Sequence, residues 1–226
     1  MRLVLEGFEK PVEITPGVVT TLQIANSALF ARLSRALLSC DGEGPFERFS
    51  LWDEEARVKE KDALLVVSDP LNLPFDHRLL YSAVVKRMER EFLEDEELRG
   101  EIERLAEALS GKFLSMGLGY NSDYTFAADW DFKRYLKMMS FGVESQLEKP
   151  YLDNLTTFLS LALDAHCKQV IVFVNLKTFL TENEFKTFCE QVFFTGLSVL
   201  LLENACDNND YEHEAKHTVD LQFIES

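Results

Sequence analysis

Basic residues are scarce in this sequence. Of its 226 residues, 23 are Lys or Arg and 39 are Asp or Glu, which gives a formal net charge of −16. Proteins that bind nucleic acid generally carry a basic excess, because they neutralise phosphates with Lys and Arg side chains. General nucleic-acid binding is therefore disfavoured, and any such function requires a local basic surface within an acidic protein.

Cysteine is also scarce, and the four cysteines lie far apart with no Cys-x-x-Cys pair. This spacing predicts reduced thiols in or near a core rather than disulfides or a zinc site. His213 and His217 are four residues apart and would share one face of a helix, but their surroundings are polar and acidic. We assign no metal ion to this pair.

Long apolar runs and an export signal are both absent. A membrane-spanning helix needs about 20 consecutive apolar residues, whereas the longest runs, at 170–174 and 197–202, have the length of strands. The N-terminus carries Glu6 in its first turn and has no small-residue cleavage site, which argues against a signal peptide. We expect a cytoplasmic protein.

The sequence does contain enough apolar material for a large core, since 46% of its residues are hydrophobic and 18 are Phe. Strand-like runs are confined to residues 1–71 and 151–226, whereas residues 72–150 show only helical spacing. We predict a discontinuous α/β head domain made of the two outer regions, with 72–150 as an α-helical leg domain. In the first region the expected elements are strands at 3–5, 12–14, 18–24 and 63–68 and a helix at 26–38.

The C-terminal region contains a β-α-β pattern. Residues 169–175 form an apolar run without alternation, as in a strand buried on both faces. Thr181 and Glu184 then match a capping box, Gly196 ends the helix, and 197–202 is a second apolar run. This order predicts parallel pairing, so the expected fold class is α/β with a mostly parallel sheet.

Three helices are predicted within residues 72–150. Pro74 precedes the first, which passes through Leu79 and Met88 and ends near Phe92. The second contains Leu98 and Leu109, with Gly111 near its end. The third covers residues 132–139.

Catalytic motifs are missing. Residues 176–180, which follow the strand at 169–175, lack the glycines and the Gly-Lys-Ser/Thr of a phosphate-binding loop. There is no Gly-x-Ser-x-Gly nucleophile elbow. We predict that the protein is not an enzyme. A degenerate P-loop nucleotide hydrolase and a metal-dependent hydrolase stay open as alternatives.

Acidic residues occur in the least regular part of the predicted leg. Calcium takes six to eight oxygen ligands, including carboxylates and carbonyls from irregular backbone. Asp123, Asp129 and Asp131 are the candidate ligands, with Asn121 beside them. The alternative is a solvated loop without a metal ion.

The basic residues of the predicted leg form two groups. In each group the first and last residues are four apart and share a helix face. A solvated helix face is the alternative interpretation, but subunits that turned these faces toward a common axis would create a positive surface. The groups are Lys86, Arg87 and Arg90, and Lys133, Arg134 and Lys137.

Several short motifs together resemble a known family. In that family a strand ending in F(I/V)N is followed by the motif LT(E/K)(D/N)E, a helix and the motif VLFLE. Residues 169–185 and 197–203 are similar to this pattern. Residues 65–69 resemble its VTD strand end, and residues 136–144 resemble its LG(V/I)K(V/I)E stretch. In order and length, the chain resembles the small CRISPR-associated proteins of type II-A systems that take part in spacer acquisition.

The resemblance implies an α/β head related to P-loop folds but without the nucleotide motif, and a projecting α-helical leg. It implies a homotetrameric ring whose positively lined hole admits double-stranded DNA ends without sequence preference. It also implies calcium near the leg–head junction, where Asp123 and Asp129 match two of the family's acids. No catalytic activity is implied. The implied partners are the spacer integrase and the RNA-guided effector nuclease.

We therefore expect a non-enzymatic DNA-end-binding protein that serves CRISPR spacer acquisition, with the two basic groups as DNA contacts. A protein-only scaffold, in which the leg docks another subunit and DNA is never touched, is the second alternative beside the nucleotide hydrolase.

Overall fold

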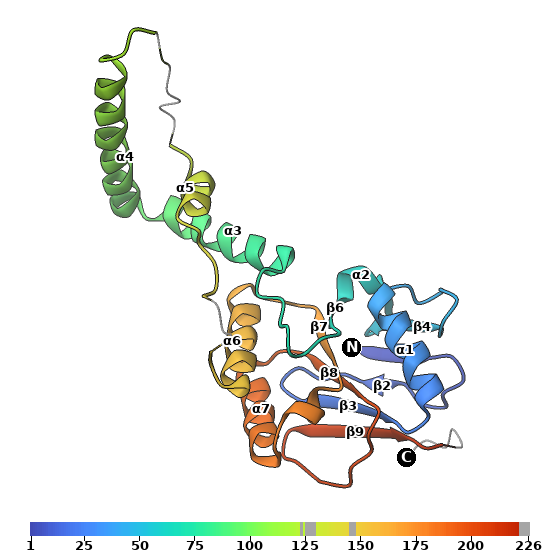
Figure 1. The fold of residues 1–226 in the computed structure, drawn as a ribbon. Helices are drawn as coiled ribbons and strands as arrows, with labels where there is room; N and C mark the ends of the chain where they lie inside the picture. The colour runs from blue at the N-terminus through green and yellow to red at the C-terminus, as the bar shows by residue number, and fades with distance from the viewer. Residues whose placement is uncertain (123, 125–129, 145–147, 222–226) are drawn as a thin grey trace. The chain divides into compact units, whose positions relative to one another are not determined.

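The computed structural model describes residues 1–122, 124, 130–144 and 148–221 (Figure 1). Its contacts divide the chain into two compact units, Met1–Phe75 with Ser145–Ser226, and Asp76–Glu144. We call the first the α/β unit and the second the helical unit, and describe each by itself. That 1–71 with 151–226 and 72–150 form separate domains stays a prediction.

A five-stranded parallel sheet forms the centre of the α/β unit, in the order β6-β7-β8-β3-β9. One register row crosses the whole sheet through Val66, Val172, Leu200, Thr20 and Ala215. The predicted α/β class and parallel pairing are thus confirmed. The strands are β6 (Leu64–Val67), β7 (Val170–Val174), β8 (Val199–Glu203), β3 (Val19–Ile24) and β9 (Glu214–Val219).

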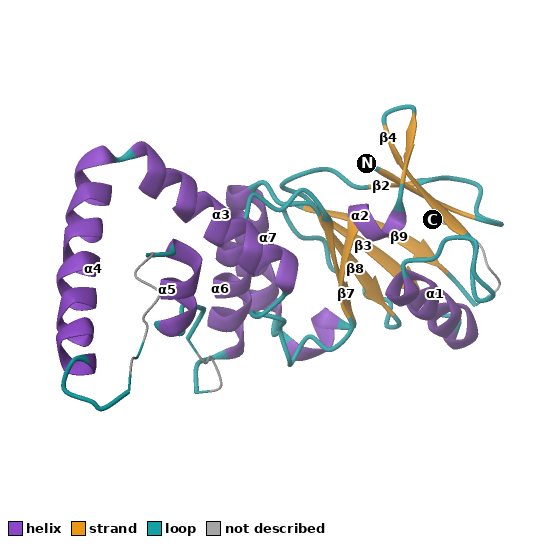
Figure 2. Cartoon of the chain, turned by 90° about the horizontal axis from the view of Figure 1, so that it is seen from above, coloured by secondary structure: helices purple, strands orange, loops and turns teal. Residues whose placement is uncertain are grey.

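Both faces of this sheet are covered, which explains why β7 and β8 are apolar without alternation. Val172 and Leu200 point into a core that they share with α1 (Ser27–Ser39). The neighbouring Phe173 points the other way, with its ring 6.2 Å from that of Phe158 in α6 (Tyr151–Asp164) and 6.1 Å from that of Phe188 in α7 (Glu182–Thr195). Figure 2 shows the strands between these helices.

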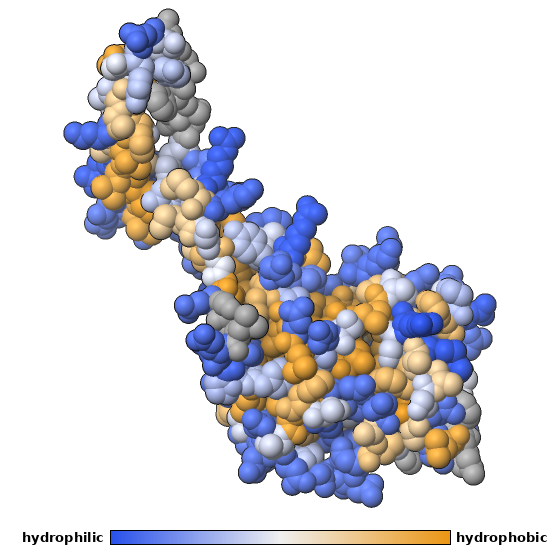
Figure 3. Space-filling view, viewed as in Figure 1, coloured by the Kyte–Doolittle hydropathy of each residue, from blue (hydrophilic) through white to orange (hydrophobic). Residues whose placement is uncertain are grey.

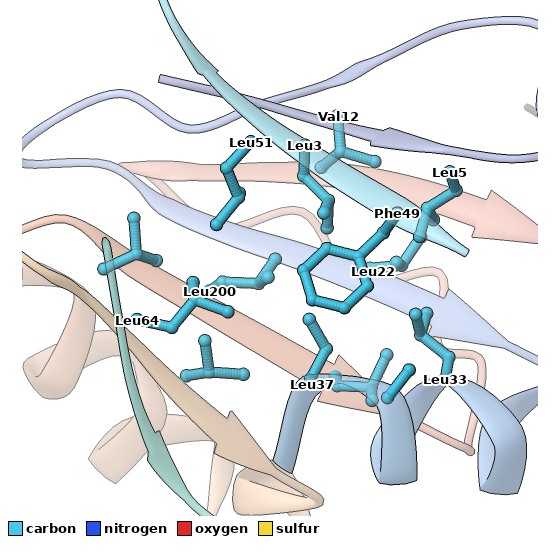
Figure 4. Packing of buried hydrophobic residues seen from close by; sticks show 14 of the residues in the cluster. Leu3, Leu5, Val12, Leu22, Leu33, Leu37, Phe49, Leu51, Leu64 and Leu200 are labelled. Carbon is cyan, nitrogen blue, oxygen red and sulfur yellow. The ribbon is translucent and has the colours of Figure 1, made fainter. Parts of the chain in front are cut away.

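A second, antiparallel sheet closes the α1 side, in the order β2-β1-β4-β5. Leu3 of this sheet pairs with Val12 and Leu51, and these side chains pack with Leu22 and Leu37 in one core (Figure 4). The predicted strands at 3–5 and 12–14 are present, whereas β4 and β5 were not predicted. The strands are β1 (Arg2–Leu5), β2 (Val12–Glu13), β4 (Phe49–Asp53) and β5 (Ala56–Val58), followed by the short helix α2 (Glu60–Ala63).

Local capping sets the helix ends in this unit. Asn26 accepts hydrogen bonds from the first backbone N–H groups of α1, at 3.1 and 3.0 Å. Thr181 and Glu184 form the predicted capping box of α7, and Gly196 ends that helix at φ +65°. A cap of this kind stabilises a helix by about 1 kcal/mol.

The C-terminal histidines do not lie on a helix, which corrects our interpretation of their spacing. His213 precedes the strand β9 at φ +67°, and His217 lies within that strand. Sequence patterning missed β9 because it is an edge strand with mostly half-buried polar residues, so it lacks an apolar run.

The helical unit consists of α3 (Arg78–Glu94), α4 (Glu96–Gly117) and α5 (Phe132–Met138). All three predicted helices are present. The first begins at Arg78, after Pro74 as expected, and the second continues past Gly111 to Gly117, because an interior glycine weakens a helix without ending it. Phe92 packs α5 on α3, since its ring lies 5.2 Å from that of Trp130 and 5.1 Å from that of Phe132.

No helix in the described part of the chain is long and apolar enough to cross a membrane.

Candidate nucleic-acid interface

Basic side chains are concentrated in the helical unit. It contains ten Lys and Arg against fourteen Asp and Glu, whereas the α/β unit contains thirteen against twenty-five. The helical unit is therefore the less acidic of the two, with a net charge of −4 against −12. Any surface that meets a polyanion is expected there.

The three basic residues of α5 are exposed and share one face. Lys133, Arg134 and Lys137 span about 100° of the helix circumference at about 100° per residue. Asp131 caps the helix, since its Oδ1 accepts the backbone N–H of Arg134 at 2.7 Å. Because Phe132 packs on Phe92, α5 is held with its apolar side against α3.

The basic residues of α3 lie among glutamates. Arg87 pairs with Glu91, one turn further on, with its Nε 2.9 Å from Oε1. Arg90 faces Glu94 in the same way at 3.9 Å. Lys86 is exposed, and no acidic side chain pairs with it in the described ranges.

One ion pair joins the two basic groups. Lys133 of α5 places its Nζ 2.8 Å from Oε2 of Glu89 on α3. Glu89 is also one turn from Lys86, so the two groups approach each other at this glutamate. Three of the six basic residues predicted to contact DNA thus have a carboxylate partner, namely Lys133, Arg87 and Arg90. Lys86, Arg134 and Lys137 have none among the residues that the structure describes.

Only one of the predicted calcium ligands can be placed. Asp123 and Asp129 lie outside the described residues, and Asp131 uses one carboxylate oxygen as a helix cap. Within the described ranges, no three His, Cys, Asp or Glu side chains come close enough to hold a metal ion. One carboxylate is too few for calcium, so the described residues do not form the implied site.

The α/β unit has a charged cluster at the carboxyl ends of β7 and β8, where open parallel sheets commonly bind ligands. Lys177 follows β7, and its Nζ lies 2.9 Å from Asp207 and 2.7 Å from Glu214. Lys216 pairs with the same Asp207 at 2.6 Å. The chain's own carboxylates thus pair with both lysines of this cluster.

Burial and pairing shift the titration of this cluster. Burial raises the pKa of Glu203 to about 7, although its Oε1 accepts the backbone N–H of Lys177 at 3.0 Å. Burial acts to raise the pKa of Asp207, but hydrogen bonds from Lys216 and Lys177 outweigh it, so this pKa is lowered. Burial acts to lower the pKa of Lys177, but hydrogen bonds to Glu214 and Asp207 outweigh it, so this pKa is raised.

The adjoining cavity measures about 240 Å³ and is bordered by the first turn of α7. Glu184 accepts the Thr181 backbone N–H at 2.8 Å, so one donor of that turn is already used. Sequence reasoning missed this cluster. A charged residue at the end of an apolar strand, Glu203, was the available signal, but Glu214, which pairs with Lys177, lies in the unpredicted strand β9.

The second feature of the helical unit is the apolar surface of α4, which has no buried residue over 22 residues. Leu105 is 66% exposed and Leu109 50%. Both border an apolar groove of about 530 Å³ between α4 and α5, which also includes Arg134. Figure 3 shows this apolar surface in orange along α4. Further exposed apolar side chains on this helix are Leu98, Phe113, Leu114 and Met116.

Comparison with known proteins gives the class and then the family. Residues 45–220 match a family model described as "CRISPR-associated protein (Cas_Csn2)". The chain is also 21% identical over 217 residues to "CRISPR-associated protein Csn2" of Enterococcus faecalis, with 94% of each protein covered. The protein is thus CRISPR-associated. Because the model match spans well over half of the chain, the protein belongs to the Csn2 family.

The raised pKa of Glu203 makes a prediction for stability. The folded state binds a proton more tightly than the unfolded state, whose carboxyl has an ordinary value of 4.5. The stability that this tighter proton binding contributes is therefore complete below about pH 4.5. It is lost as the pH rises to about 7, and the free energy of unfolding falls by up to about 1.4 kcal/mol per pH unit. Replacing Glu203→Gln should flatten this loss.

The measurement is urea unfolding at pH 5, 6, 7 and 8. Glu55→Gln, at an exposed position of the same unit, is the matched control and should keep the wild-type pH dependence. Identical pH profiles for wild type and Glu203→Gln would contradict the assignment of this carboxyl.

Proposed function

We propose that this protein binds double-stranded DNA ends, without sequence preference, in the hole of a homotetrameric ring, and that this binding supports CRISPR spacer acquisition in bacterial antiviral defence. Family membership supports a CRISPR role. The proposed partners are the spacer integrase and the RNA-guided effector nuclease of the same system. The observation that carries the proposal is the coexistence, in one helical unit, of an uncovered apolar helix and exposed basic side chains.

The apolar face of α4 supports self-association. Burial of a Leu side chain stabilises an assembly by about 1.5–3 kcal/mol, and large exposed apolar surfaces mark interaction sites. The face lies on the same unit as the basic residues. Association of helical units therefore gathers cationic side chains from several chains and makes a locally positive surface in an acidic protein.

Phosphate contacts from these side chains would supply the affinity. Arg134, Lys137 and Lys86 are exposed and have no carboxylate partner in the described part of the chain, so they are the first candidates. Contacts to phosphate carry no sequence information, which accounts for binding without sequence preference. Such binding weakens steeply as salt rises, because bound DNA releases counterions.

We also propose that the protein is not an enzyme, and that its parallel sheet is related to P-loop folds. The β7–α7–β8 unit has the order of a P-loop unit. At the phosphate position, however, Lys177 is held by Asp207 and Glu214, and the first turn of α7 is capped by its own residues. These contacts oppose the binding of a nucleotide phosphate and argue against the hydrolase alternative.

Calcium stays a proposal that rests on the resemblance. Asp131 is the one described candidate ligand, and the described residues alone do not form a site.

Charge reversal on α5 tests the DNA surface. We expect Lys133→Glu with Arg134→Glu and Lys137→Glu to weaken duplex binding more than about 100-fold in a gel-shift titration, because three phosphate contacts become repulsive. Among single alanine variants, Arg134→Ala and Lys137→Ala should lose more affinity than Lys133→Ala, since Lys133 is already paired with Glu89.

The matched control places the same three reversals on the α/β unit, at the exposed residues Lys149, Lys168 and Lys186. It should bind duplex within a few-fold of wild type. If both triple variants lose equal affinity, net charge rather than the α5 face governs binding, and the assignment fails.

Apolar-to-charged changes on α4 test the assembly. Wild type should give a mass of four 25.9 kDa chains by light scattering. Leu105→Glu with Leu109→Glu should reduce the mass, because two carboxylates would enter the interface. Leu38→Glu with Leu71→Glu, at exposed apolar positions of the α/β unit, should leave it unchanged. A monomeric wild type, or an intact tetramer in the α4 variant, would contradict the proposed assembly.

A further inference from the structure

Three glutamates of α3 each face one of the basic residues assigned to DNA. Glu89 holds Lys133 at 2.8 Å, Glu91 holds Arg87 at 2.9 Å, and Glu94 faces Arg90 at 3.9 Å. Of the six basic residues assigned to DNA, only three thus have no carboxylate partner among the described residues.

These ion pairs are exposed, so they can exchange. The side chains of Arg87 and Glu91 are 39% and 57% exposed, and those of Lys133 and Glu89 are 53% and 32% exposed. Exposed pairs are weak and are screened by salt. A phosphate can therefore replace a glutamate on the same cation, provided that the local phosphate density is high.

A replaced glutamate still affects the complex. Each of the three lies on the same helix as Lys86, within two or three turns of it, and therefore stays near the bound phosphates. A carboxylate and a cation that approach the DNA together add no net charge, so such a pair neutralises little of the phosphate charge. The glutamates thus lower both the affinity and the number of counterions released.

From these contacts we propose that Glu89, Glu91 and Glu94 are internal competitors of DNA phosphate, which keep duplex binding weak and readily reversible. This inference rests on the proposed function, since it concerns the regulation of the same surface. The three glutamates limit the affinity, whereas Arg134, Lys137 and Lys86 supply it.

The test is the variant Glu89→Gln with Glu91→Gln and Glu94→Gln, in the full-length protein, titrated with linear duplex at several salt concentrations. Glutamine keeps the size and hydrogen-bonding groups of the side chain and removes its charge. We expect affinity to rise roughly tenfold to a hundredfold at low salt. The slope of log affinity against log salt should steepen by roughly 0.9 for each cation released to phosphate.

The matched control removes three charges from α4, by Glu101→Gln, Glu103→Gln and Glu107→Gln. These exposed residues pair with no basic side chain in the described ranges. The control should keep the wild-type salt slope and gain little affinity. Glu91→Gln alone, which leaves the α3–α5 ion pair intact, should give a smaller gain in the same direction.

The outcomes separate the two proposals. If wild type binds duplex and the α3 variant has the same affinity and slope, or the α4 control changes equally, the competitor role is wrong while the proposed function stands. If neither wild type nor the variants bind duplex at any salt concentration, the proposed function itself fails.

Discussion

The proposed assembly depends on the apolar face of α4, which stays accessible in the described structure. All 22 residues of the helix are at least partly accessible, and the exposed side chains include Leu105, Leu109 and Phe113. Exposing such a face to water is unfavourable, so covering it stabilises the helical unit. If further copies of the chain cover it, the assembly that results also concentrates the scarce cations.

Electrostatics then divides the molecule into two parts with different tasks. In the α/β unit, Asp207 and Glu214 hold Lys177 and Lys216 as internal partners at the edge of the parallel sheet. In the helical unit, pairing is partial and exposed. Such pairs permit exchange with an outside polyanion, whereas buried pairs resist it. Under the proposed function, in which DNA passes on to other components, the weaker kind favours release.

Local signals explain how much of this could be predicted. The strand, capping box and terminal glycine around α7 lie next to one another in the chain, so sequence alone predicted β7, α7, β8 and their parallel pairing. The edge strand β9 lacks an apolar run and was missed, and with it the partners of Lys177. The tie between Lys133 and Glu89 depends on Phe92 packing against Phe132, which no local pattern reveals. The basic groups were found, but their pairing was not.

A competition between linear and covalently closed circular duplex of the same sequence tests the central claim most directly. A closed ring can be entered only by a DNA end, so the account predicts that linear duplex competes for the protein and that closed circles do not. Linearising the circle with one cut should restore competition. Equal competition by closed circles, or no binding to either form, would contradict the account.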